Sequence, residues 1–331
     1  MNRILKTGVL MLSICILGCK PNVAKSYIDK NIPEHPKSEI KVLNEKLFKA
    51  LKDNNKQEVT KLFSTGLIKV MNIKLDSFIY IAHHNIVETN SFSVTKEFYI
   101  VNSTDYTSNT IFSGLTGEYE YTFHYLAINK EMYITMIVPD TEPDQMLITC
   151  IYGKYPEGWK INIIQLGLYQ IRHKNVIDLY KEAQIKYEKG YIVDAGNSLF
   201  ILQSCLYPAN DLMHYNLEGK IKDFYESVQT ESKQKYVFPY ELKAIKSKPM
   251  ITNISSKILY EGDYPLVEYL TQIQLTDTTN LRKENDEIQK LIGGIYRGID
   301  KEKKFLFYRA WNKIPDGKTQ LPTYEFKKQL N

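Results

Sequence analysis

Few side chains in this sequence have the type and spacing that a catalytic or metal-binding site requires. His83, His84 and Glu88 form the tightest group of potential metal ligands, and on a helix His84 and Glu88 would share one face. Zinc sites in proteins use three or four ligands, and no further histidine or carboxylate follows at a suitable spacing. We therefore expect no metal site in this segment.

His124 is a second candidate, because a histidine beside carboxylates can act as a general base. It shares one strand face with Glu118, Glu120 and Thr122, opposite a face of tyrosine and phenylalanine. Acidic neighbours would favour the protonated imidazole, and the pattern is more typical of a solvated strand face than of a catalytic site. The sequence contains no G-x-S-x-G, H-E-x-x-H or Cys–His nucleophile motif.

Two further segments could bind ligands. The glycine-rich stretch 293–298 follows the end of an expected helix, whereas a phosphate cradle lies between a strand and a helix N-terminus. The mixed charges of residues 301–304 indicate a solvated loop. Tyrosines and lysines alternate in residues 180–191, but helical spacing assigns these tyrosines to a core rather than to base stacking. We expect neither a cofactor nor a nucleic-acid partner.

The composition sets the class of protein. The chain has 331 residues, more than one compact core usually holds, and its 43% hydrophobic content excludes wholesale disorder. A net charge of +5 is too small to indicate a nucleic-acid-binding protein, and four cysteines exclude a disulfide-dense scaffold. The abundance of tyrosine, 25 residues, suits half-buried strand faces.

The N-terminal residues carry the sharpest functional signal. Arg3 and Lys6 precede the apolar run 7–17, which is too short to span a hydrocarbon core of ~30 Å. The sequence Ile16-Leu17-Gly18-Cys19 follows, and it resembles the lipobox of bacterial lipoproteins. The resemblance implies that residues 1–18 are a signal peptide cleaved by signal peptidase II and that Cys19 carries acyl chains such as palmitate. The alternative is an ordinary signal peptide or a membrane anchor in which Cys19 is incidental.

The residues after Cys19 bear on localisation. No aspartate follows the cysteine, which resembles outer-membrane rather than inner-membrane sorting, and no acidic cluster resembling a surface-export signal is present. We expect a lipid-anchored protein of the cell envelope, attached to the outer membrane and facing the periplasm. Residues 19–38 contain Pro21, Pro33 and Pro36 and indicate a tether.

Residues 39–172 have the pattern of an α+β domain. The spacing of Ile40, Leu43, Leu47 and Leu51 predicts an amphipathic helix, a shorter helix follows to residue 64, and from Phe92 the period changes to two. A four-strand antiparallel meander then ends in the strand that begins Gly158-Trp159-Lys160. This order resembles the NTF2-like superfamily, in which a curved sheet wraps a long helix around a conical pocket. The alternative is an unrelated α+β domain.

Residues 173–235 return to helical spacing. Two helices meet at Gly190 and end before Pro208, which resembles a single tetratricopeptide hairpin, and a third helix covers 212–228. We interpret this segment as a helical connector. Residues 236–331 form a C-terminal α+β domain, with expected strands at 240–246, 251–260, 266–275 and 305–311 and a helix at 281–296.

Two cysteines remain after Cys15 leaves with the signal peptide and Cys19 is acylated. Cys150 lies in an apolar strand and Cys205 beside the apolar stripe of a helix. A disulfide would join the helical connector to the first domain, but two separate buried thiols suit these environments better.

Two functions are compatible with these features. The first is a non-enzymatic lipoprotein that binds an envelope protein or a small apolar ligand. The second is an NTF2-like isomerase or dehydratase, and for it the resemblance implies a carboxylate base and an acid donor, with Tyr121, His124 and Asp76 as the nearest candidates. The first is favoured because no catalytic constellation is evident. A pocket filled by aromatic rings would support it, whereas an open apolar pocket with a buried acid would support an enzyme.

Overall fold

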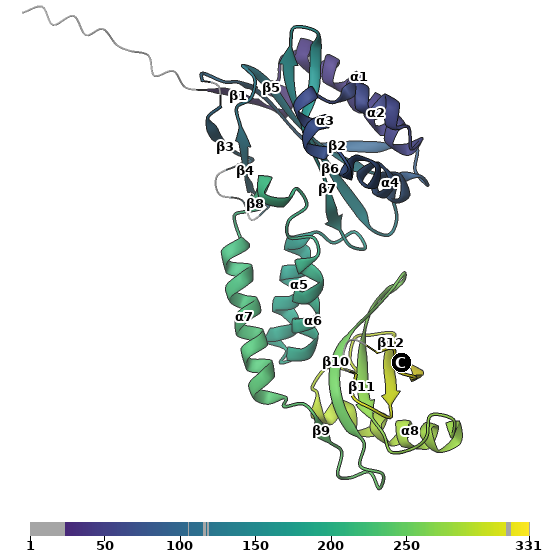
Figure 1. Cartoon of the computed structure of the whole chain (residues 1–331). Coiled ribbons are helices and arrows are strands. Elements are labelled where there is room, and N and C mark those ends of the chain that lie inside the picture. The colour runs from purple at the N-terminus through teal and green to yellow at the C-terminus, as the bar shows by residue number, and fades with distance from the viewer. Residues whose placement is uncertain (1–23, 105, 115–116, 118, 316–318, 331) are drawn as a thin grey trace, which may run out of the picture.

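Three units follow one another along the chain in a computed structural model (Figure 1). The structure describes residues 24–330 except 105, 115–116, 118 and 316–318. The expected signal peptide and Cys19 lie outside these described residues. The fold is α+β, with mainly antiparallel sheets, as the sequence predicted.

The first unit is built on a five-stranded antiparallel sheet with the strand order β1-β2-β5-β6-β7. Its first strand was not expected, because residues 19–38 were interpreted as a tether. Residues 25–28 instead pair with the end of β2, and a long helix begins at Glu34, so the described part of this segment belongs to the folded unit. The strands of this sheet are β1 (Lys25–Ile28), β2 (Phe92–Val101), β5 (Glu131–Pro139), β6 (Gln145–Tyr155) and β7 (Gly158–Gln170).

Helices cover one face of this sheet (Figure 1). In the apolar stripe predicted for α1, Ile40, Leu47 and Leu51 are fully buried against the sheet and Leu43 is half-buried. Two short helices and a longer one complete the layer, where the sequence had indicated only one further helix. The helices are α1 (Glu34–Lys52), α2 (Lys56–Leu62), α3 (Thr65–Met71) and α4 (Lys74–Ile86), and a 3₁₀ turn η1 (Asp29–Asn31) precedes them.

A second, three-stranded sheet covers the other face. The strand predicted around Tyr121–Tyr125 is present, but it pairs with β3 and with a strand from the helical connector rather than within the main sheet. The expected continuous meander is therefore wrong at this strand. The small sheet has the order β3 (Ser108–Phe112), β4 (Tyr121–Leu126) and β8 (Met213–Tyr215), and η2 (Asn210–Leu212) leads into β8.

The connector consists of the expected helical pair and a third helix, which covers Glu218–Lys235 rather than the predicted 212–228 because residues 213–215 form a strand. The Asn175 side chain accepts hydrogen bonds from the backbone N–H groups of Ile177 and Asp178, and the Asp178 carboxylate accepts one from the Asn175 N–H, which forms a capping box. Gly190 makes the turn between the first two helices with φ of 77°. The helices are α5 (Val176–Glu188), α6 (Ile192–Gln203) and α7 (Glu218–Lys235).

The C-terminal unit is a second five-stranded sheet with one helix. Helix α8 connects β11 to its parallel neighbour β12, and Asp277 caps this helix by accepting a hydrogen bond from the Asn280 N–H. The C-terminal strand was not predicted. The elements are β9 (Tyr240–Glu241), β10 (Met250–Leu259), β11 (Gly262–Leu270), α8 (Thr278–Ile295), β12 (Phe305–Trp311) and β13 (Tyr324–Gln329), in the sheet order β13-β12-β11-β10-β9.

One buried apolar cluster runs from Phe98 in the first unit through the connector to Ala310 in the last. Cys150 and Cys205 are both buried and unpaired, which confirms the prediction of two separate thiols. Burial raises the pKa of the Cys205 thiol to about 12. Within the described residues, no helix combines the length and apolar character needed to cross a bilayer.

Candidate functional site

The histidine pair at the end of α4 does not form a metal site. Nδ1 of His83 lies 2.7 Å from the Lys52 carbonyl oxygen, so this ring is used to hold α4 against the end of α1. His84 is exposed and stacks on Tyr80. Across the described part of the chain, no group of three or more histidine, cysteine, aspartate or glutamate side chains could hold a metal ion.

The three residues considered for an enzyme lie apart. The Tyr121 hydroxyl is buried beneath the small sheet, where it contacts the Met136 sulfur at 3.1 Å, and burial raises its pKa well above the usual value. His124 is exposed on β4 and packs edge-on against His214. Asp76 is exposed on α4, on the other face of the main sheet, in an ion pair with Lys56. The fold does not bring these three residues to one site.

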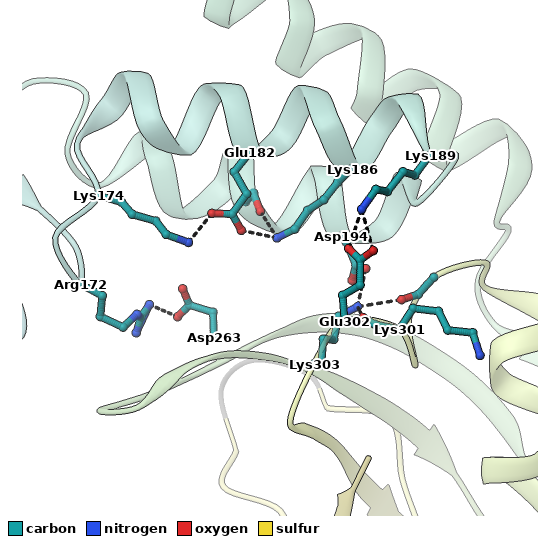
Figure 2. A network of polar contacts seen from close by, with 12 residues as sticks. Arg172, Lys174, Glu182, Lys186, Lys189, Asp194, Asp263, Lys301, Glu302 and Lys303 are labelled. Carbon is teal, nitrogen blue, oxygen red and sulfur yellow. Dashed lines mark hydrogen bonds and ion pairs between the residues drawn. The ribbon is translucent and has the colours of Figure 1, made fainter. Parts of the chain in front are cut away.

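The charged residues gather elsewhere, around a cavity of about 290 Å³ between the α5–α6 pair and the C-terminal unit. Figure 2 shows ion pairs along this junction, with residues from the helices facing residues from the C-terminal unit. We call this region the charged joint. It consists of Arg172, Lys174, Glu182, Lys186, Lys189, Asp194, Asp263, Glu302 and Lys303.

One end of the charged joint is fixed by Arg172, which follows β7. Its guanidinium forms an ion pair with Asp263 of β11 and donates a hydrogen bond of 3.0 Å to the Leu259 carbonyl at the end of β10. Burial raises the pKa of the Asp263 carboxyl, and the Arg172 guanidinium acts in the opposite direction. The β10–β11 hairpin is thereby held against the segment that leaves the first unit.

The other end is fixed by a buried ion pair. Lys303 donates to Asp194 at 2.5 Å, to the Gly298 carbonyl at 2.7 Å and to the Lys301 carbonyl at 2.9 Å, so all three ammonium hydrogens have an acceptor. Burial raises the pKa of Asp194 and lowers that of Lys303. The interpretation of residues 301–304 as a solvated loop is therefore wrong at Lys303, whose side chain is only 11% exposed.

Between these ends, Glu182 of α5 joins two lysines. It accepts from Lys174 at 2.5 Å and from Lys186 at 2.6 Å, and Lys186 also donates to the Ser198 hydroxyl at 2.8 Å. Burial on its own would raise the pKa of Glu182, but the two ammonium groups lower it overall. Glu182 is thus held as a carboxylate at neutral pH.

Gly298 permits close packing between the two units beside the charged joint. Gly298 has a φ of 89°, and a Cβ atom built on it would lie 2.2 Å from the Tyr191 ring. Any larger residue would therefore meet both backbone strain and a clash. Gly298 therefore lets the chain before β12 pack closely on Tyr191 at the start of α6, whereas Gly293 faces Asp300 of its own unit.

The cations of the charged joint are paired with its carboxylates. Each of the four cations that line the cavity contacts a carboxylate: Arg172, Lys174, Lys186 and Lys303. The ion pairs of Arg172 and Lys303 join the helical pair and the segment before it to the C-terminal unit and hold the two units together. Sequence reasoning missed Asp194 and Lys303. The usable signal was an acid inside the apolar stretch Ile192-Val193-Asp194-Ala195, since a buried acid requires a partner.

No protein-family model and no curated protein matches the chain.

Proposed function

We propose that this chain is a lipid-anchored envelope protein that acts by binding another envelope component and not by catalysis. The anchor is the acylated Cys19, supported by the basic residues, apolar run and lipobox that precede it. Attachment to the outer membrane, facing the periplasm, is supported by the residues after Cys19.

We further propose that the first unit has an NTF2-like arrangement, because a long helix lies on one face of an antiparallel sheet. In such a domain the space between helix and sheet would hold the ligand. Here that space is filled by aromatic side chains: Tyr133 and Tyr152 are fully buried, and Trp159 is 6% exposed. This filled interior is the observation that carries the non-enzymatic proposal. The groove of about 840 Å³ beside it, between α1 and β2, is lined mostly by polar residues such as Glu34, Lys37 and Lys41, which does not suit a small apolar substrate.

The polar groups inside this core are also satisfied by one another. Asn44 of α1 donates a hydrogen bond of 3.2 Å to the Thr135 hydroxyl and accepts one of 3.0 Å from the Tyr152 hydroxyl. None of the three side-chain oxygens of this network belongs to a carboxylate that could act as a base. The network stabilises one packing of helix on sheet, as buried and satisfied polar groups do.

The single tetratricopeptide-like helical pair supports the same proposal. It is not free to form an array, because α5 and α6 contribute to the continuous core and the charged joint fixes the C-terminal unit to them. The three units therefore present a composite outer surface, which suits recognition of a protein better than enclosure of a small molecule.

Two measurements test this proposal. Cells supplied with an alkyne-tagged palmitate should yield labelled protein from the wild type and from Cys150→Ala, which serves as the matched cysteine control. Cys19→Ala should accumulate as unlabelled precursor. Labelling of Cys19→Ala would overturn the lipid anchor.

The second measurement is native mass spectrometry of the detergent-extracted wild type. We expect the mass of the polypeptide plus its acyl chains and no stoichiometric small molecule. A bound apolar compound that is lost when Tyr152 is replaced by tryptophan would contradict the filled interior and favour the enzyme.

A further inference from the structure

The distance between anchor and fold is short. Strand β1 begins at Lys25, so six residue steps separate it from Cys19. At about 3.5 Å per residue, a fully extended chain places Lys25 within ~21 Å of the lipidated residue. An acylated chain must therefore hold the first unit against the membrane, and one of its surfaces must face the headgroups.

The strand register identifies the end of the sheet at which the chain enters. Lys25 pairs with Val101, the last residue of β2, and Val101 pairs with Glu131, the first residue of β5. Tyr155, which ends β6, lies at this same end. Together with Ile128 it lines a groove of about 660 Å³, and α3 lines the other side of that groove.

The turn that joins α3 to α4 exposes aliphatic side chains beside this groove. Val70 is 81% exposed and Ile73 is 84% exposed, the highest values for large hydrophobic side chains in the described part of the chain. Both are much more exposed than aliphatic side chains of this size usually are. Tyr80 and Ile81 continue the exposed apolar strip along α4. We call residues 69–74 the α3–α4 turn.

Lysines flank these aliphatic residues. Lys69 and Lys74 stand at either end of the α3–α4 turn, both are exposed, and neither has an ion-pair partner among the residues that the structure describes. Exposed aliphatic side chains between unpaired cations are the chemistry of a segment that enters the headgroup region of an anionic bilayer. Lysines are depleted at protein–protein interfaces, so a protein partner fits this turn less well.

We propose that the α3–α4 turn is a second membrane contact, which inserts Val70 and Ile73 among the headgroups of an anionic bilayer while Lys69 and Lys74 bind lipid phosphates. The inference rests on the proposed function, because it requires the acylated Cys19. The acyl chains and the turn act together. Because Cys19 is only six residues from β1, the lipid anchor keeps the turn at a high effective concentration at the membrane surface. Two attachment points also fix which side of the protein faces away from the membrane.

The test uses the acylated full chain in vesicles of phosphatidylethanolamine and phosphatidylglycerol. The fluorophore NBD is attached to Ile73→Cys, since the native Cys150 and Cys205 are buried. The matched control is Tyr260→Cys, which is also exposed, at 73%. Tyr260 follows Leu259, which contacts Arg172 beyond the C-terminal end of β7, at the opposite end of the first sheet.

We expect NBD at position 73 to shift its emission to shorter wavelength and to be quenched by lipids brominated near the headgroup. The same fluorophore at position 260 should show neither effect. Replacing Lys69 and Lys74 with serine should reduce the quenching at position 73, and raising the salt concentration should do the same.

The outcomes separate this inference from the proposed function. If mass spectrometry showed no acyl chains on the protein, the proposed function itself would be contradicted. Acylated, vesicle-bound protein without quenching at position 73 would overturn the second contact alone. A shorter emission wavelength without quenching would place the turn against protein, such as a second copy of this chain, and would also overturn it.

Discussion

Nζ of Lys303 lies 2.5 Å from Oδ2 of Asp194, although 109 positions separate the two residues in the chain. The two side chains are 11% and 4% exposed, so this ion pair is shielded from water. The pair fastens the loop before β12 to the first turn of α6. It therefore helps to hold the C-terminal unit on the helical pair, together with the Arg172–Asp263 ion pair and the shared apolar core.

Removing one member of this pair should destabilise the protein strongly. Lys303→Met leaves the Asp194 carboxylate buried without its partner, and we expect the free energy of unfolding to fall by about 3–5 kcal/mol. The double variant Asp194→Leu/Lys303→Met should recover most of this loss, because neither charge is then buried. Urea unfolding measures both effects. Lys189→Gln is the control, since its ion pair with Glu302 is exposed and should change stability little. A double variant as unstable as the single one would contradict the argument.

Glu182 should make the charged joint sensitive to acid. Its pKa in the folded chain lies below the ordinary value of 4.5, since Lys186 and Lys174 outweigh the effect of burial. Its contribution to stability is therefore fully present above that ordinary value and is lost as the pH falls through the folded pKa. Glu182→Gln should be less stable than the wild type at neutral pH, and the difference should shrink in acid. Thermal unfolding across this pH range measures it, and a constant difference would exclude the mechanism.

Two glycines of the stretch 293–298 should respond oppositely to alanine. Gly298→Ala forces a Cβ into the Tyr191 ring at a φ of 89°, and we expect the melting temperature to fall. Gly294 lies near the end of α8 with no heavy atom within 4 Å of an added Cβ. Gly294→Ala should therefore stabilise the helix by about 0.5–1 kcal/mol. Equal effects of the two substitutions would show that the contact with Tyr191 is unimportant.

Glu284 should be a destabilising residue. It is 3% exposed on α8, and within the described chain neither carboxylate oxygen has a hydrogen-bond partner. Glu284→Gln keeps the shape and removes the charge, so we expect the free energy of unfolding to rise by about 1–3 kcal/mol at neutral pH. Glu287→Gln, an exposed neighbour on the same helix, should have little effect. A loss of stability in Glu284→Gln would instead indicate that the carboxylate binds a cation or an ordered donor.

Periodicity in the sequence predicted the elements whose buried face is regular. Ile40, Leu47 and Leu51 predicted α1, and the cluster after Asp277 predicted the start of α8. Residues 305–311 were predicted as a strand and form β12. These predictions succeed because spacing alone reports which side chains share a face.

The same reasoning failed where partners come from distant segments. The alternating pattern of β4 is the same whether it pairs within the main sheet or with β8, so spacing did not reveal the second sheet. The mixed charges of residues 301–304 indicated a solvated loop. Lys303 is buried instead because it pairs with Asp194, which lies on another element. Strand β1 was not predicted because the prolines around it indicated a tether. Its pairing with β2 depends on the fold of the rest of the sheet, which local spacing does not report.

If the chain is anchored as proposed, the edge position of β1 gives it a reserve of length. Only four residue pairs hold β1 to β2, and the next fixed point is Asp29, which accepts a hydrogen bond from the Glu97 N–H and forms an ion pair with Lys96. If a pull from the membrane peeled β1 off the sheet, the free chain would extend from Cys19 to Asp29. At about 3.5 Å per residue its span would grow from ~21 Å to ~35 Å. Unpairing of β1 would then lengthen the chain between the lipid and the fold. The protein could follow a partner away from the bilayer while its acyl chains stayed in the membrane.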